Sequence, residues 1–114
     1  MEFDAFTIVL LVRRDDAPAL DGASAAALQD AHMSHLADMQ ADGALLAAGP
    51  VHDDRIRGLC IYRTRVDEAR ERAERDPAVR AGRFAVEVVA WNVPKGVVAF
   101  PGDVALPRSM SDLA

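Results

Sequence analysis

The chain has 114 residues, 51% of them hydrophobic, and a formal net charge of −5. It is long enough for one domain with a buried core and too short for two. Its acidic balance argues against nucleic acid or an anionic membrane as the main partner. No apolar run approaches the roughly 20 residues of a membrane helix, and the first residues lack the pattern of a signal peptide. We therefore expect a cytoplasmic protein.

Residues 5–12, AFTIVLLV, form a short apolar run rich in β-branched side chains, which predicts the first strand. Both faces of this strand are apolar, so both need cover. Residues 13–23 contain proline, glycine and several charged side chains. They predict a loop, and this loop is long enough to arch over the mouth of a pocket.

A helix is predicted from Ser24, its N-cap, to Asp42, with Gly43 ending it. At 3.6 residues per turn, His32 and His35 fall on its apolar stripe. A histidine on the inward face needs a polar partner, because an unsatisfied buried polar group is costly.

Two strands follow, over residues 44–48 and 56–63, and we expect them to pair as a hairpin. Gly49 and Pro50 end the first of these strands. Cys60 lies in the second and is the one cysteine of the sequence. This excludes a disulfide framework and predicts a buried structural thiol.

A second helix is predicted over residues 67–75, with Asp67 as its N-cap. Asp76 and Pro77 end this helix, because proline disfavours a helical conformation at the residue before it. Asp76 is also placed to cap one further turn. Residues 83–93 alternate between two largely apolar faces and predict the last strand.

The predicted order β-α-β-β-α-β indicates an α+β domain of ferredoxin-like fold, with a four-stranded antiparallel sheet and both helices on one face. The other sheet face would be apolar, so we expect a homodimer in which a second copy covers it. We assign this domain to residues 1–93. Residues 94–114 are predicted to be a C-terminal tail, either an arm on a neighbour or a loose terminus.

Several motifs along the chain resemble those of the YciI-like (YCII-related) family. They are HxxHLxxMxxxGxLLxAGP over residues 32–50, RGLxIY from 57, EAR from 68, DPAVRAGR over 76–83 and VEVVAW over 86–91. The resemblance implies a ferredoxin-like, dimeric α/β barrel fold and an active site built from one histidine and one aspartate. In this sequence those two residues are His32 and Asp76.

A histidine and an aspartate suit general acid-base catalysis, because histidine titrates near neutral pH and a carboxylate orients it. We therefore predict His32 and Asp76 as the catalytic pair of a small-molecule pocket. His35, Gly49 and Pro50 are the predicted substrate contacts. The alternative is that His32 is a satisfied core histidine and Asp76 only caps a turn.

No serine-hydrolase elbow, P-loop or dinucleotide fingerprint occurs in the sequence. His32, His35 and His52, without an HExxH pattern or a cysteine cluster, give little reason to expect a metal. We expect no metal and no cofactor, and a lyase- or isomerase-like proton transfer on an unidentified small molecule. Two alternatives stay open: a non-catalytic metabolite-binding or regulatory module on the same fold, and a purely structural dimer.

Overall fold

The computed structural model describes residues 1–113, and its elements follow the predicted β-α-β-β-α-β order. They are β1 (Phe3–Arg13), α1 (Gly22–Ala41), β2 (Leu45–Pro50), β3 (Ile56–Tyr62), α2 (Val66–Glu74), α3 (Pro77–Arg80), β4 (Phe84–Pro94) and the short 3-10 helix η1 (Met110–Leu113). The turn that Asp76 was expected to cap is α3. None of the helices in this part of the chain is long and apolar enough to cross a membrane.

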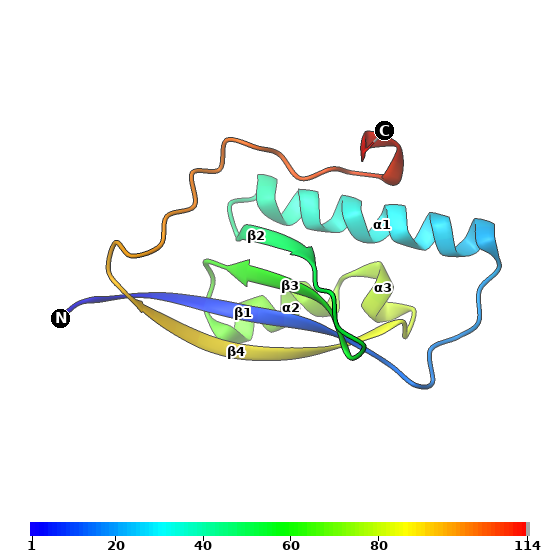
Figure 1. The fold of residues 1–114 in the computed structure, drawn as a ribbon, viewed down its shortest axis with the longest axis horizontal. Coiled ribbons are helices and arrows are strands. Elements are labelled where there is room, and N and C mark those ends of the chain that lie inside the picture. Colours follow the sequence, from blue (N-terminus) through cyan, green and yellow to red (C-terminus); the bar gives the residue numbers. More distant parts are fainter. Residues whose placement is uncertain (114) are drawn as a thin grey trace.

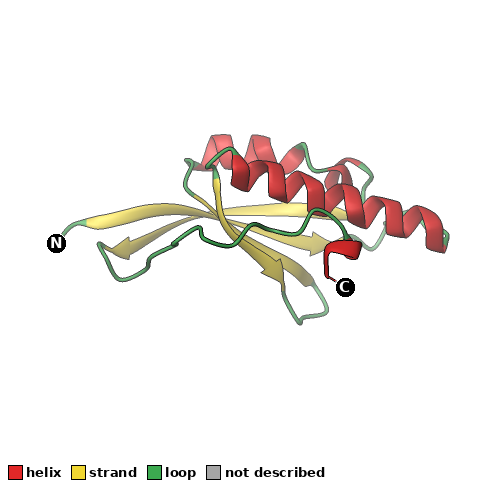
Figure 2. Ribbon diagram, turned by 90° about the horizontal axis from the view of Figure 1, so that it is seen from above, coloured by secondary structure: helices red, strands yellow, loops and turns green. Residues whose placement is uncertain are grey.

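The four strands form one antiparallel sheet in the order β2-β3-β1-β4 (Figure 1). β1 and β4 pair along their whole length, from Phe3 opposite Pro94 to Arg13 opposite Phe84. Helices α1 and α2 both lie on one face of this sheet (Figure 2). This is the ferredoxin-like arrangement of an α+β domain, so the predicted fold class is confirmed at the level of the single chain.

The core lies between the sheet and the helices, because alternate residues of each strand point to that face. Its fully buried members come from β1, β3, α2 and the start of β2: Val9, Leu11, Ala44, Leu45, Cys60, Tyr62, Ala69 and Ala73. The two small alanines of α2 let this helix approach the sheet closely. Thr7 shares the same face, and its hydroxyl donates to the carbonyl of Thr64 at 2.7 Å.

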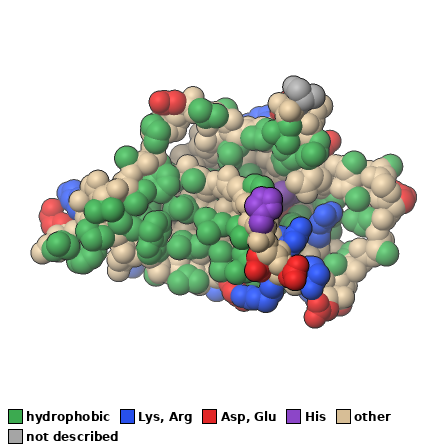
Figure 3. Space-filling model, in the orientation of Figure 1, with side chains coloured by type: hydrophobic (Ala, Val, Ile, Leu, Met, Phe, Trp, Pro, Cys, Tyr) green, Lys and Arg blue, Asp and Glu red, His purple; other side chains and the backbone are tan. Residues whose placement is uncertain are grey.

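The opposite sheet face is also apolar. Phe6 of β1 packs against Trp91 of β4 there, with ring centroids 5.8 Å apart. Phe100, from the segment after β4, meets Phe6 edge-on at 5.4 Å. Figure 3 views the molecule from this side, and hydrophobic side chains gather over the strands. We call this surface, with Phe6, Ile8, Leu10, Val89 and Trp91, the open sheet face.

Both long helices begin earlier than predicted. The N-cap of α1 is Asp21 rather than Ser24, and its carboxylate accepts from the Ser24 backbone N–H at 2.7 Å. The N-cap of α2 is Arg65, which makes no side-chain capping bond, and Asp67 lies in the first turn instead. The predicted end of α1 is confirmed, since Gly43 has a φ of +85°, a conformation that glycine adopts easily.

The segment after β4 folds back along α1 of its own chain (Figure 1). We call residues 95–113 the tail. The Gln40 amide donates to the Val104 carbonyl at 2.9 Å and accepts from the Leu106 N–H at 2.7 Å. Further along, Arg108 pairs with Asp38 at 2.7 Å. The tail therefore packs on α1 of its own chain.

Candidate active site

His32 of α1 and Asp76 of α3 form a buried contact. The His32 Nδ1 lies 2.6 Å from the Asp76 Oδ2, and the two residues are only 8% and 2% exposed. They are 44 positions apart in sequence. The packing of α3 against α1 brings them together. A contact this short between a histidine and a carboxylate is a strong, charge-assisted hydrogen bond when the ring is protonated.

Asp76 is held in place by the helix that it begins. Its other carboxylate oxygen, Oδ1, accepts from the Ala78 backbone N–H at 2.9 Å, which makes Asp76 the N-cap of α3. Pro77 at the first helical position suits this geometry, because its fixed φ favours the start of a helix. Each carboxylate oxygen thus has its own partner, and the orientation of the group toward His32 is fixed.

The contact also sets which ring nitrogen of His32 carries the proton. A carboxylate facing Nδ1 favours the proton on that nitrogen, so Nε2 of the neutral ring is left as an acceptor. Nε2 makes no hydrogen bond to any residue in 1–113. The ring of Phe84 packs edge-on against the imidazole, with centroids 6.0 Å apart, and restricts its rotation.

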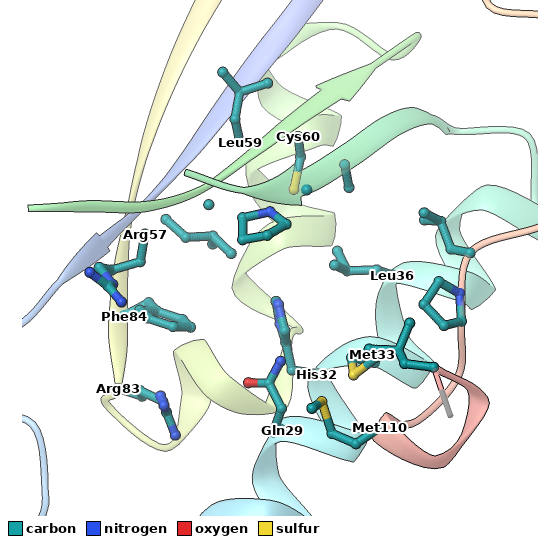
Figure 4. A pocket seen from close by; sticks show the side chains of 18 residues that line it. Gln29, His32, Met33, Leu36, Arg57, Leu59, Cys60, Arg83, Phe84 and Met110 are labelled. Atoms are coloured by element: carbon teal, nitrogen blue, oxygen red, sulfur yellow. The ribbon is translucent and has the colours of Figure 1, made fainter. Parts of the chain in front are cut away.

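A cavity of about 640 Å³ opens beside His32. It lies between α1, the β2-β3 hairpin, the start of β4 and the tail (Figure 4). Most of its lining is apolar, and His32 and Gln29 are among its few polar groups. A cavity of several hundred Å³ with a small number of polar groups is typical of small-molecule sites.

The structure brings four of the five predicted site residues to this region. Gly49 and Pro50 line the cavity at the end of β2, beside His32, with Asp76 behind the imidazole. His35 does not line it. The Nε2 of His35 is buried without a hydrogen-bond partner among the described residues, and burial lowers the pKa of this side chain.

The sequence reasoning missed several lining residues. Arg57 and Arg83 line the cavity, and both lie inside motifs that had been matched without a role for them. The tail contributes Leu106 and Met110, which no periodic pattern indicated. The loop over residues 13–23, although long enough to arch over a pocket mouth, is not among the segments that line this cavity.

Cys60 is the buried structural thiol that was predicted. Although it borders the cavity, it is 3% exposed, and burial raises its pKa to about 12. A thiol with such a pKa stays protonated near neutral pH and is a poor nucleophile. Within residues 1–113, no group of three or more histidine, cysteine or acidic side chains is arranged to hold a metal ion.

The fold and the site together define a ferredoxin-like α+β protein with a buried histidine-aspartate pair beside a cavity of small-molecule size. The chain belongs to the YCII-related domain family, whose model matches residues 7–92. This confirms the resemblance seen in the motifs. The match ends before the tail begins.

Among solved structures, the chain is similar to 5-chloro-2-hydroxyhydroquinone dehydrochlorinase from Burkholderia phenoliruptrix AC1100, in complex with 2,5-dihydroxybenzoquinone. The TM-score is 0.56 at 22% sequence identity, over 79% of this chain and 96% of that one. This likeness shows a shared fold. No curated protein matches the sequence.

Proposed function

We propose that this protein is an enzyme that transfers protons on a small organic molecule, with His32 as the acid-base group and Asp76 orienting it. The observation that carries the proposal is the 2.6 Å contact between His32 Nδ1 and Asp76 Oδ2, on a ring that lines the cavity. Proton transfer needs a base of suitable pKa and a fixed geometry, so a cofactor is not required.

In the proposed reaction, neutral His32 removes a proton from a carbon next to a carbonyl group of the ligand. The C–H electron pair moves toward the carbonyl oxygen, which gives an enolate, and the proton goes to Nε2. Asp76 stabilises the resulting imidazolium through Nδ1. An isomerisation ends when Nε2 returns the proton to a different ligand atom. An elimination ends when a neighbouring leaving group departs with its electron pair.

The apolar lining assists this chemistry. A cavity with few polar groups excludes water and strengthens the interaction of the imidazolium with the carboxylate behind it. The dehydrochlorinase of similar fold acts, by its name, on a chlorinated hydroxyhydroquinone. We propose a lyase- or isomerase-like step on a small oxygen-bearing molecule for the present chain as well.

We also propose that the working form is a homodimer joined through the open sheet face. Val89 on this face is 50% exposed, and Phe6 and Trp91 are only half-buried within the single chain. A second copy, related by a twofold axis, would place the same apolar residues on both sides of the interface. Such an interface resembles a domain core cut in half.

Proton abstraction is tested most directly by deuterium incorporation. The protein is incubated in D₂O with small 1,3-dicarbonyl compounds and hydroxyquinones, and loss of the carbon-bound proton is followed by ¹H NMR. The expected result is catalysed exchange that falls by about 10²–10⁴-fold in His32→Gln. His35→Gln is the matched control, since it removes a histidine from the same helix outside the cavity.

The outcome separates the enzyme from its alternative. Equal exchange rates in the parent protein and in His32→Gln would contradict the proposed role of His32. Ligand-induced chemical-shift changes around Gly49 and Gly58 without any catalysed exchange would instead indicate a metabolite-binding module. One observation favours this alternative: Asp76 also caps α3, so the position of its carboxylate is explained without any role in catalysis.

A further inference from the structure

Two arginines stand on one side of His32 in the cavity. Arg57 comes from β3 and Arg83 directly precedes β4, and Figure 4 shows both near Phe84. Met33 of α1 and Met110 of the tail lie on the other side of the imidazole. The cavity thus has a cationic side and an apolar side, with His32 between them.

The two guanidinium groups form no ion pair within residues 1–113, although Arg57 is near enough to the Asp53 carboxylate to help lower its pKa. No aspartate or glutamate lines the cavity, and neither arginine forms an ion pair with any residue that the structure describes. The chain has 18 acidic residues against 13 basic ones, so acidic partners are abundant. Arg72 and Arg108, for example, each pair with an aspartate at 2.7 Å. Other arginines, such as Arg63 and Arg65, also form no ion pair with a described residue, so what distinguishes Arg57 and Arg83 is their common position in the cavity.

Both guanidinium groups are held in ways that leave most of their donors available. Arg57 donates from Nη1 to the Asp53 carbonyl at 2.8 Å, and its other N–H groups have no partner among residues 1–113. Arg83 lies over the ring of Phe84, with its Cζ 5.6 Å from the ring centroid. A cation-π contact fixes the plane of a guanidinium without consuming an N–H donor.

We propose that the cavity binds a small organic anion whose charge is on oxygen, held by Arg57 and Arg83, with its apolar body against Met33 and Met110. The planar guanidinium matches the two oxygens of a carboxylate, and it also stabilises an ionised phenol. This inference rests on the cavity of the proposed function and names the substrate class. The bound anion lies beside His32, so its adjacent carbon is presented to Nε2.

The test measures binding in the absence of turnover, so it is independent of whether His32 is catalytic. Matched pairs of probes are titrated into ¹⁵N-labelled full-length protein: benzoate with benzamide, hexanoate with hexanamide, and 4-nitrophenolate with 4-nitroanisole. The first two pairs report a carboxylate ligand and the third reports a phenolate ligand. We expect at least one anion to shift the signals of Gly49, Gly58 and Gln29, and to bind about tenfold more tightly than its neutral partner.

The variants Arg57→Gln and Arg83→Gln should each reduce that anion preference severalfold, and the double variant should abolish it. Arg80→Gln is the control, because it removes the same charge from α3 without touching the cavity. His32→Gln should keep the preference, even though it removes the proposed base. Loss of exchange chemistry in the parent protein with retained anion preference would thus count against the proposed function alone.

Three results would overturn the inference. They are equal binding of the anions and their neutral partners, an anion preference that survives in the double arginine variant, and failure of every anionic probe to shift the signals of the cavity residues. A preference for inorganic phosphate over all the organic anions would also overturn it, since the apolar side would then have no role.

Discussion

At the scale of single residues, Asp76 links α1 to α3 through its two carboxylate oxygens. One oxygen contacts His32 and the other caps α3, and substitutions can test the two contacts separately. Asp76→Ala removes the N-cap of α3, which costs about 1 kcal/mol of stability, and leaves the Nδ1–H of His32 without its partner. An unpaired buried donor costs about 1–3 kcal/mol more. Asp76→Asn keeps an oxygen for the cap, and its amide NH2 can donate to the Nδ1 of His32 once the neutral ring carries its proton on Nε2. We therefore expect its stability to be closer to that of the parent protein.

Urea denaturation checks this order of stabilities. The midpoint should fall in the sequence parent, Asp76→Asn, Asp76→Ala. The exposed Asp54, in the turn between β2 and β3, provides the control substitution Asp54→Ala, for which we expect almost no change. An Asp76→Ala variant as stable as the parent would show that the contact with His32 contributes nothing to the fold.

His35 makes stability depend on pH. Burial lowers its pKa in the folded chain, because the charged ring is poorly solvated there. The unfolded chain, with a histidine pKa near 6.5, therefore takes up a proton that the folded chain resists. The stability that the folded chain has with a neutral His35 is complete above about pH 6.5. It is lost as the pH falls from there through the lowered pKa of His35.

His35→Leu should remove that part of the pH dependence. We expect the variant to lose less stability than the parent between about pH 8 and about pH 5, measured as the urea midpoint at each pH. It also removes the Nε2 atom that has no partner among the described residues. His52→Leu, at an exposed position, is the control. Parallel pH profiles for the parent and His35→Leu would contradict the prediction.

The sequence alone could propose His32 and Asp76 only through the family motifs. Their contact joins two helices, and nothing in the local pattern of either residue encodes a partner 44 positions away. The arginines illustrate the opposite case. Arg57 and Arg83 lie within matched motifs, yet solvated arginines are common, so only their joint position in the cavity distinguishes them.

At the scale of elements, the tail is the part of the site that lies outside the family domain. It lines the cavity with Leu106, Pro107, Met110 and Leu113, while the family match ends at residue 92. Side-chain contacts from Gln40, Asp38 and Asp30 of α1 hold it in place. The tail is therefore a wall of the cavity outside the strands of the sheet, although Leu106 also packs against the edge of the core and Phe100 against Phe6.

A chain that stops after Gly102 should keep its fold and lose ligand affinity. We expect an unchanged far-ultraviolet circular dichroism spectrum and about tenfold weaker binding of the best anionic probe, because the apolar side of the cavity is opened. The full-length variant Arg108→Ala is the control for losing one tail contact, and it should weaken binding less. Unchanged affinity in the shortened chain would mean that the tail does not contact the ligand.

The starts of the helices show how precisely local sequence patterns predict an N-cap. Asp21 and Gly22 follow a stretch of proline and charged residues, so they resemble loop, and Ser24 is an equally good N-cap by residue type. The structure selects Asp21, whose carboxylate reaches the Ser24 N–H. Several acceptable caps lie within one turn here, and packing of α1 decides among them.

At the scale of the whole molecule, the strand order was predictable because two amphipathic helices separated by strands leave few antiparallel arrangements. Where the tail runs was not predictable. Its composition resembles a loose terminus, and its position depends on a few side chains of α1 that also suit an exposed helix surface.

The proposed homodimer has a direct test. Light scattering coupled to size-exclusion chromatography should give twice the chain mass for the parent protein. Val89→Glu should give the mass of one chain, because it puts a charge in the centre of the open sheet face. Val104→Glu makes the same substitution at an 81% exposed position on the tail and should leave the dimer intact. A parent protein that elutes with the mass of one chain would contradict the proposal.

The position of the tail after β4 has a consequence for the order of folding. β4 pairs with β1 along their full length without any contribution from residues beyond 95. The strands of the sheet are complete at Pro94, so the sheet and its helices do not need the docked tail in order to form. We therefore expect a newly made chain to fold before its cavity is closed, and any ligand affinity that depends on the tail to follow the docking of the tail on α1.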